Sequence, residues 1–314
     1  MGNDLYFYAG ELISSAWSLG GLLSSTEAGV SDERTLVIDL LDAPPCEPSE
    51  LEWVHHWPSE GCGMSLAISG EDASFLLRFS NLADFVISEC GRQIRVWPAL
   101  ETGLETLNHL LLDQVLPRVL SQRGLLVLHA GAVRVGNHAI AFLGDTGSGK
   151  STLTASFHAA GYSLLSDDGL AVKNEGLWAL PTYPSLRLWP DAIASIYAQK
   201  AVVAPMAHYS SKRRIVMTDV AAEPLPLGAL YVLESGAVTP DRSILLRRLT
   251  PGAACVTIIA NSFQLDVTDL HHAADTLADA GRIAECVPVF SLAYPWDFAR
   301  LPEVQEAILA QRSE

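Results

Sequence analysis

Apolar residues over positions 1–100 come in short runs separated by polar and turn-forming residues. Runs of this length, bounded by turn signals, are typical of β-strands. The runs cover residues 35–41, 64–68, 75–79 and 94–97. We therefore expect residues 1–100 to form a β-rich N-terminal region.

The spacing of apolar residues changes after residue 103. They now recur every three or four positions, at Leu104, Leu107, Leu111, Val115 and Val119. This spacing predicts one apolar side of a helix. Pro117 falls inside the pattern and is expected to kink the helix or to end it early, because proline lacks the backbone donor. Residues 101–124 are therefore predicted to be a connecting helix.

Both strands and helices are predicted from residue 125 onward. The predicted strands cover residues 125–129, 132–135, 139–143, 162–165 and 287–292. The predicted helices cover residues 153–160, 268–280 and 302–310. Gly136-Asn137 supplies a hairpin turn, and Gly161 stands where a helix C-terminal cap is expected. This mixture predicts an α/β domain over residues 125–314.

A glycine-rich pattern, Gly-x-x-x-x-Gly-Lys-Ser, lies between a predicted strand and a predicted helix. Backbone amides of such a loop converge on a helix N-terminus, which favours a phosphate group. Lys150 would reach the β- and γ-phosphates, and the Ser151 hydroxyl would coordinate Mg²⁺. The alternative is a glycine-rich turn without a ligand. We predict a site for ATP with Mg²⁺ formed by Gly144, Asp145, Thr146, Gly147, Ser148, Gly149, Lys150, Ser151 and Thr152.

The acidic pair Asp167-Asp168 ends the predicted strand that follows the loop's helix. A second carboxylate ligand for Mg²⁺ is expected at this position. Since neighbouring residues at a strand end point in different directions, one carboxylate can serve the metal while the other meets an acceptor hydroxyl. The alternative is ordinary turn chemistry. His129 ends a strand expected to run near the loop, and it can reach the same pocket or serve as a core histidine.

Basic residues are densest at Lys212, Arg213 and Arg214. Guanidinium groups suit the oxygens of a transferring phosphoryl group, so these residues are candidate phosphate or substrate contacts. A solvated loop is the other interpretation. The pairs His55-His56 and His271-His272 lack acidic or cysteine partners at metal-ligand spacing, and we expect structural roles for them.

Charge and cysteine content limit the classes of partner. The 314-residue chain carries a formal net charge of -16, which works against nucleic-acid binding. Its five cysteines are widely spread without paired spacing, which favours a reducing compartment. The chain shows neither a secretory signal pattern nor an apolar run long enough for a membrane helix. We expect a cytoplasmic protein that binds no membrane.

Three features together resemble the HPr kinase/phosphorylase family, whose P-loop fold is related to that of phosphoenolpyruvate carboxykinase. His129 precedes Gly144 by fifteen residues, Gly144-Asp145-Thr146-Gly147 opens the loop, and Asp167 follows Ser151 by sixteen. The resemblance implies an α/β kinase with a mixed sheet, flanking helices, and ATP and Mg²⁺ as cofactors. It also implies that Asp167 is the catalytic base, that Asp168 assists Mg²⁺, and that His129 supports the aspartate.

The resemblance changes beyond Asp168. The family signature Glu-Ile-Arg-Gly-Leu-Gly corresponds to Ser185-Leu186-Arg187-Leu188-Trp189, so Arg187 matches and Ser185 replaces the metal-binding glutamate. The closing stretch at residues 294–302 resembles HPr-kinase-related proteins encoded beside peptide-modification genes. Some of these phosphorylate the C-terminal serine of lasso-peptide precursors. The N-terminal region is expected to recognise a substrate or partner, and a homo-oligomer is compatible with the hexamers of true HPr kinases.

These observations predict a kinase that transfers the γ-phosphoryl group of ATP to a serine hydroxyl of a peptide or small protein. Two alternatives remain. A non-catalytic ATP-binding sensor would explain the replacement of the glutamate by Ser185, and a small-metabolite kinase would follow from the carboxykinase relationship.

Overall fold

Strands and helices gather into two units in the computed structural model. The model describes residues 3–20, 22–24, 35–45, 52–58, 63–69, 74–173, 175–183, 185–198, 201–217, 219–234 and 243–311. The first unit comprises Met1–Leu125, Pro205–Ser211 and Gln264–Ala273. The second comprises Leu126–Ala204, Lys212–Phe263 and Ala274–Glu314. The fold is mixed α/β.

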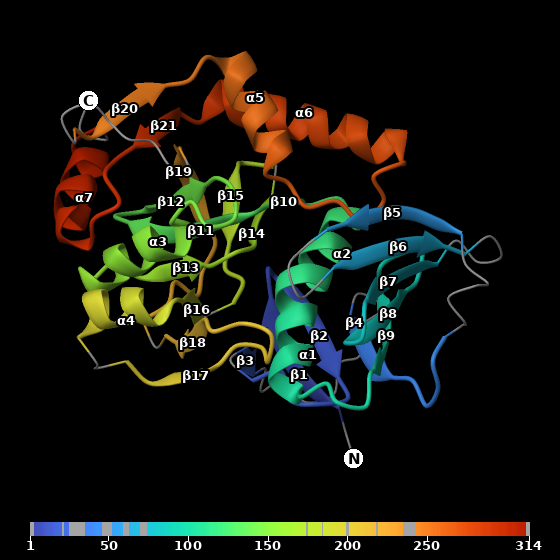
Figure 1. Ribbon diagram of the computed structural model, residues 1–314. Coiled ribbons are helices and arrows are strands. Elements are labelled where there is room, and N and C mark those ends of the chain that lie inside the picture. The colour runs from blue at the N-terminus through green and yellow to red at the C-terminus, as the bar shows by residue number, and fades with distance from the viewer. Residues whose placement is uncertain are drawn as a thin grey trace. The chain divides into compact units, whose positions relative to one another are not determined.

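One sheet dominates the first unit (Figure 1). Its order is β3-β1-β2-β4-β9-β8-β7-β6-β5. Its strands are β1 Asp4–Tyr8, β2 Glu11–Ser15, β3 Leu23–Ser24, β4 Leu36–Leu40, β5 Trp53–Trp57, β6 Met64–Ile68, β7 Phe75–Phe79, β8 Ala83–Ile87 and β9 Gln93–Pro98. Neighbours pair antiparallel except β4, which runs parallel to both β2 and β9. All four apolar runs predicted for this region are strands, and the sheet also takes in segments that the sequence analysis did not single out.

A helical rod follows the sheet of the first unit. It consists of α1 Leu104–Leu110, a π-helical turn η2 Leu111–Val115, and α2 Leu116–Gln122. The helix therefore runs past Pro117, which stands in the first turn of α2. Proline would clash with the carbonyl four residues before it, and the wider π turn immediately ahead accommodates the ring. Of the five residues predicted to form the apolar side of this helix, Leu104 is exposed and the other four are buried.

Both histidine pairs lie in the first unit. His56 Nδ1 shares a hydrogen bond with Ser65 Oγ at 3.0 Å, and His272 Nε2 shares one with Ser121 Oγ at 2.9 Å. These contacts join neighbouring elements, as a structural role requires.

A second mixed sheet forms the centre of the second unit (Figure 1). Its order is β10-β14-β15-β19-β12-β11-β13, and β21 joins β19 and β20. Its strands are β10 Leu126–Leu128, β11 Ala130–Val135, β12 His138–Leu143, β13 Leu164–Ser166, β14 Leu170–Lys173, β15 Trp178–Leu180, β19 Leu225–Leu233, β20 Leu245–Arg248 and β21 Val289–Ala293. β12 and β21 run parallel to β19. The predicted hairpin joins β11 to β12, with Val135 opposite His138.

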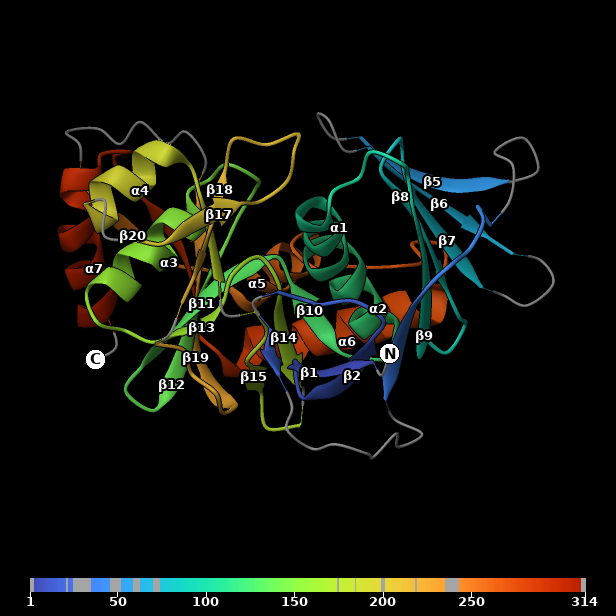
Figure 2. The same ribbon diagram turned by 90° about the horizontal axis from the view of Figure 1, so that it is seen from below.

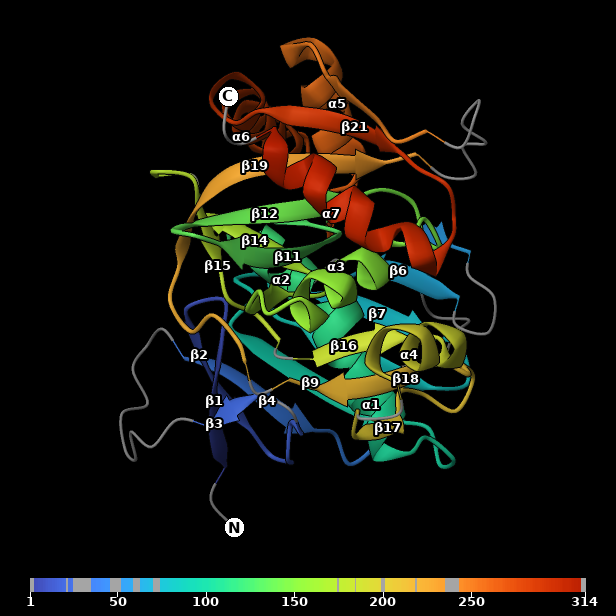
Figure 3. The same cartoon turned by 90° about the vertical axis from the view of Figure 1, so that its left-hand side faces the viewer.

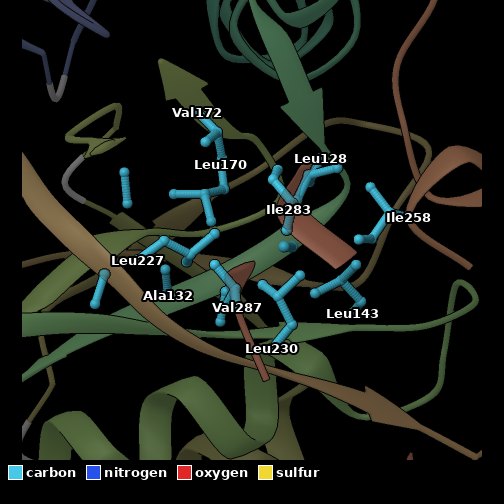
Figure 4. Close-up of a cluster of buried hydrophobic side chains, with 14 of the residues drawn as sticks. Leu128, Ala132, Leu143, Leu170, Val172, Leu227, Leu230, Ile258, Ile283 and Val287 are labelled. Carbon is cyan, nitrogen blue, oxygen red and sulfur yellow. The ribbon is translucent and has the colours of Figure 1, made fainter. Parts of the chain in front are cut away.

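Helices cover both faces of this sheet (Figure 2). They are α3 Lys150–Ala159, α5 Pro251–Ala260, α6 Leu270–Cys286 and α7 Leu301–Ala310. A further helix, α4 Pro190–Tyr197, packs with the third sheet described below. Alternate residues of β12 enter two different cores. Leu143 packs with residues of α5 and α6 (Figure 4), whereas Phe142 packs with residues of α3 and α7. A strand that is covered on both faces is held rigidly. The end of β12 therefore fixes the position of Gly144, the residue that follows Leu143.

A small third sheet lies beside α4 (Figure 3). Its order is β16 Ser185–Leu188, β18 Arg213–Val216 and β17 Val203–Pro205. Leu186, Leu188 and Ile215 pack with α4 residues in a core of their own. Arg187 and Arg214, which stand opposite each other, lie on the other face of β16 and β18.

No helix in the described part of the chain is both long and apolar enough to cross a membrane. Cys90, Cys255 and Cys286 have free thiols, and the remaining two cysteines, Cys46 and Cys62, lie outside the described residues.

Candidate functional site

The glycine-rich loop connects β12 to α3 and depends on residues without a side chain. Gly144 has φ 141°, and a Cβ there would lie 2.8 Å from the carbonyl oxygen of Leu233. Gly149, at the N-cap of α3, has φ 98° and would place a Cβ 3.2 Å from the Tyr294 hydroxyl. Both positions need glycine for its positive φ and for the close approach of other atoms.

The N-terminus of α3 presents backbone amides at the end of this loop. Among the described residues, no side chain caps the helix at Gly149. The first N–H groups of a helix have no partner within it, and the helix dipole adds a partial positive charge at the same point. An anion is therefore a suitable partner for these amides.

Lys150 is almost fully buried in the loop, with 5% of its surface exposed. Its Nζ donates to the carbonyl oxygens of Gly144 at 2.6 Å and Asp145 at 3.0 Å. Burial lowers the pKa of the Lys150 ammonium, while the nearby carboxylates of Asp168 and Asp167 act in the opposite direction. The lysine thus brings a positive charge into a partly dehydrated loop, close to two acidic side chains.

Asn261, which the sequence analysis did not single out, fixes both the loop and His129. Its Oδ1 accepts a hydrogen bond from the Gly144 amide at 3.1 Å, and its backbone carbonyl accepts one from the His129 amide at 2.7 Å. Asn261 caps the C-terminus of α5. Since it stands 117 residues after Gly144, no local pattern in the sequence indicates this contact.

The acidic pair follows β13 directly, as predicted, and the two carboxyl groups have different surroundings. The side chain of Asp167 is fully buried, at 0% exposure, whereas the side chain of Asp168 is 23% exposed. Asp168 has φ 67°, a left-handed conformation that aspartate tolerates better than most residues. Both carboxyl groups reach Arg187 Nη1, which lies 3.4 Å from Asp167 Oδ2 and 3.2 Å from Asp168 Oδ2.

Burial, and next the charge of Asp168, raise the pKa of Asp167 to about 7, although Arg187 and the Ser151 side chain act to lower it. Burial also disfavours the charged form of Asp168. The hydrogen bond from His129 and the charges of Arg187, His129 and Lys212 outweigh that effect and hold the pKa of Asp168 well below its usual range. The pair therefore combines one carboxyl group that can exchange a proton near neutral pH with one that stays ionised.

His129 and Arg187 contact the acidic pair from different elements. His129 Nε2 lies 3.5 Å from Asp168 Oδ1, and the His129 ring packs against Phe263 with ring centroids 5.7 Å apart. The Arg187 amide donates to Asp167 Oδ2 at 3.0 Å, and its Nη1 lies 3.2 Å from Asp168 Oδ2. Arg187 is 2% exposed, so its guanidinium neutralises the pair rather than facing open solvent.

Tyr183 supports Arg187 from one side, with the guanidinium carbon 4.9 Å from the ring centroid. The Tyr183 hydroxyl accepts a hydrogen bond from Arg214 Nη1 at 2.7 Å. The sequence analysis missed Tyr183 because it belongs to no motif. Its contacts are with Arg187 and Arg214, which come later in the chain.

Strand register separates the predicted basic cluster. Arg187 stands opposite Arg214, and Leu188 stands opposite Arg213. Paired residues share a face of the sheet and successive residues alternate. Arg214 is therefore on the face of Arg187, while Arg213 is on the face of Leu188, where it is exposed at the strand end. Lys212 Nζ lies 5.6 Å from the centroid of the Trp189 ring.

Three of the buried side-chain oxygens that lack a hydrogen-bond partner among the described residues belong to the loop, the acidic pair and β16: Ser148 Oγ, Asp167 Oδ1 and Ser185 Oγ. Such atoms are costly unless a ligand, an ion or water completes their bonding. Ser151 and the acidic pair supply the hydroxyl and carboxylate oxygens that Mg²⁺ prefers, and Mg²⁺ commonly takes its other ligands from phosphates and water. In the described part of the chain no group of three or more His, Cys, Asp or Glu residues could hold a metal unaided. The donor set thus fits Mg²⁺ bound together with a nucleotide.

Among known proteins, a likeness to this chain appears at the level of solved structures. No family model and no curated protein sequence matches the chain. Among solved structures, the fold is distantly similar to that of the HPr(Ser) kinase/phosphatase from Coxiella burnetii, with a TM-score of 0.32 and 13% sequence identity. The match covers 60% of this chain and 95% of the other.

Proposed function

We propose that the second unit is an ATP- and Mg²⁺-dependent kinase that phosphorylates a serine hydroxyl of a peptide or small protein. The observation that carries this proposal is the state of the Asp167 carboxyl group. It is a buried carboxyl group with a pKa of about 7, one oxygen of which has no described partner, and its pKa responds to Ser151 of the loop. A general base needs a pKa near the working pH and a free oxygen to receive a proton.

Each group of the site has a part in the transfer. The amides at the start of α3 and the Lys150 ammonium bind the phosphates of ATP. Asp167 Oδ1 accepts the proton of the acceptor hydroxyl as its oxygen attacks the γ-phosphorus. The bond from that phosphorus to the β–γ bridging oxygen breaks, and ADP leaves. Mg²⁺, held by Ser151 and Asp168, would supply charge neutralisation on the phosphates.

The remaining residues position these groups. His129 and Arg187 hold the Asp168 carboxylate in place, and Arg187 also orients Asp167 through its backbone amide. Arg187 brings positive charge to the point where negative charge moves during transfer. Most of the rate enhancement would come from positioning and electrostatics, because phosphoryl transfer requires little covalent chemistry from the protein.

The resemblance of the closing stretch implies the C-terminal serine of a lasso-peptide precursor, with the first unit recognising the substrate or a partner. We place the reaction in the cytoplasm, where ATP and Mg²⁺ are supplied, and a homo-oligomeric enzyme is compatible with it.

A non-catalytic sensor is the second candidate, and Ser185 is the observation that favours it. The resemblance expects a glutamate there, whereas Ser185 is fully buried and its hydroxyl lacks a described partner. Such a protein would bind ATP without transferring its phosphoryl group, and ATP occupancy would change its affinity for a partner.

Incubation with ATP labelled in the γ-phosphate, Mg²⁺ and serine-containing peptides distinguishes these candidates. A kinase gives a labelled phosphopeptide and ADP in equal amounts, and Asp167→Ala binds ATP but gives neither. A sensor binds ATP and yields no product with any acceptor. Label on a small molecule from a cell extract, with all peptides unlabelled, identifies a metabolite kinase.

A further inference from the structure

Three parallel strands of the central sheet, β12, β19 and β21, end at the same edge. The glycine-rich loop follows β12, so the segment that follows β21 starts at the edge where this loop lies. A close approach supports this placement, because a Cβ on Gly149 would lie 3.2 Å from the Tyr294 hydroxyl. The segment then leads into α7, which packs beside α3 (Figure 3).

An exposed indole stands near the start of this segment. The Asp297 amide donates to the Pro295 carbonyl oxygen at 2.8 Å, which closes a three-residue turn with Trp296 at its centre. The Asp297 side chain accepts from the Ala299 amide at 3.0 Å and caps a short helix, η4 Phe298–Arg300. Trp296 is 63% exposed. The backbone around Trp296 is therefore fixed, while its ring is open to solvent.

The indole is within reach of the glycine-rich loop. Trp296 comes two residues after Tyr294, so the Cα atoms of these two residues lie within about 7 Å of each other. Tyr294 in turn approaches Gly149, the N-cap of α3. Trp296 thus extends from a point next to the helix N-terminus that we assign to the phosphates of ATP.

The order of the strands gives the direction in which a nucleotide would lie. β13, which ends at the acidic pair, and β21, which ends at the aromatic segment, lie on opposite sides of β12. Under the proposed function the γ-phosphate faces Asp167, so the adenosine end points away from β13 and toward the ends of β19 and β21. Trp296 stands on that side, and Phe298, which is 38% exposed, follows two residues later.

We propose that the Trp296 ring stacks on the adenine ring of ATP. Stacking of a nucleobase on an aromatic side chain is favourable for every base, because each base has a π face. An acceptor peptide is the other candidate for this ring, but the proposed transfer puts the acceptor at Asp167, on the β13 side of β12. This inference rests on the proposed ATP-dependent function. It adds a residue that sets the affinity for the nucleoside part, whereas the loop and Lys150 set the affinity for phosphates.

Binding of ATP and of inorganic tripolyphosphate tests the proposal, because both ligands carry three phosphates and only ATP carries a nucleobase. Trp296→Ala should raise the Kd for ATP by about 5–50-fold and leave the Kd for tripolyphosphate within about twofold. Trp296→Phe keeps an aromatic face and should stay within about fivefold of the wild-type Kd for ATP. Calorimetric titrations with Mg²⁺ present measure these constants.

Trp178→Ala is the matched control, since Trp178 is another exposed tryptophan of the second unit. Trp178 stands opposite Pro226, at the start of β19, whereas the glycine-rich loop approaches Leu233, at the end of β19. This variant should leave both Kd values unchanged. A wild-type Kd for ATP in Trp296→Ala would overturn the proposal. Equal losses of affinity for ATP and tripolyphosphate, or an equal effect of Trp178→Ala, would also overturn it.

The same measurements separate this inference from the kinase function. Trp296-dependent binding of ATP without transfer to any acceptor keeps the stacking contact and rejects the kinase. Transfer to serine, with the Kd for ATP unchanged in Trp296→Ala, keeps the kinase and rejects the stacking contact. A protein that binds neither ATP nor tripolyphosphate rejects both.

Discussion

The buried carboxyl group of Asp167 should make the folded protein less stable as the pH rises. Its pKa is raised from the ordinary 3.8 to about 7, chiefly by burial. A raised pKa means that the folded state binds a proton more tightly than the unfolded state does, so stability is lost as the pH rises from about 4 to about 7. Asp167→Asn removes this ionisation. The asparagine carbonyl can still accept the hydrogen bond that the Arg187 amide donates to Asp167 Oδ2.

The size of the effect follows from the two pKa values. The pKa difference between 3.8 and about 7 corresponds to a loss of about 4 kcal/mol in the free energy of unfolding at high pH, because each pKa unit is worth about 1.4 kcal/mol. Loss of the charge interaction with Arg187 is already included in that interval. We expect Asp167→Asn to raise the free energy of unfolding by about 2–4 kcal/mol at about pH 8 and by little at about pH 4. Denaturant titrations at several pH values measure this.

Asp168→Asn is the matched control with the opposite sign. The pKa of Asp168 is held below its usual range by His129, Arg187 and Lys212, so its charge stabilises the fold at neutral pH. This variant should lower the free energy of unfolding above the ordinary aspartate pKa, and the loss should shrink as the pH falls through the depressed pKa of Asp168. If Asp167→Asn is destabilising at about pH 8 and indistinguishable from Asp168→Asn, the electrostatic account of the pair is wrong.

Three further variants test the site. Lys150→Ala should weaken ATP binding by about 10–100-fold, because a charge-assisted bond to phosphate is lost, and calorimetric titration measures it. Asn261→Ala should weaken ATP binding by about 2–10-fold, because the Gly144 amide loses its acceptor; an unchanged Kd contradicts a role in fixing the loop. Gly144→Ala should cost about 1–3 kcal/mol of stability and most nucleotide affinity, since its φ is 141° and its Cβ would meet Leu233. A wild-type denaturation midpoint would contradict that strain.

Sequence reasoning succeeded where one local pattern decides the structure. Residues 64–68 and 75–79 are strands with the predicted limits, because a run bounded by turn residues has few other ways to pair its backbone. The predicted hairpin at Gly136 forms, with φ 61° at that residue. Gly161, at φ 93°, follows α3 at the predicted C-terminus. Each of these signals depends on a few neighbouring residues.

The parts that sequence reasoning missed depend on contacts between distant segments. Asn261 reaches Gly144 across 117 residues, and Tyr183 acts through Arg187 and Arg214. The basic cluster could not be divided into two faces before the pairing of β16 with β18 was known, because a shift of one residue would exchange Arg213 with its neighbours. The tolerance of Pro117 likewise depends on a π turn that no local propensity predicts.

Asp167 also bears on whether Ser166-Asp167-Asp168-Gly169 is only turn chemistry. An aspartate that serves a turn accepts bonds from nearby backbone amides and stays near solvent. Asp167 is instead buried, accepts from an amide twenty residues later, and leaves Oδ1 without a described partner. Ser166 already closes the local turn by donating to the Gly169 carbonyl oxygen at 2.7 Å. A buried carboxyl group with a raised pKa reduces stability and adds nothing that the turn requires. The arrangement is explained if Asp167 receives a proton from a bound acceptor. The pH dependence of the unfolding free energy of Asp167→Asn then measures how much stability the protein loses by keeping this carboxyl group buried.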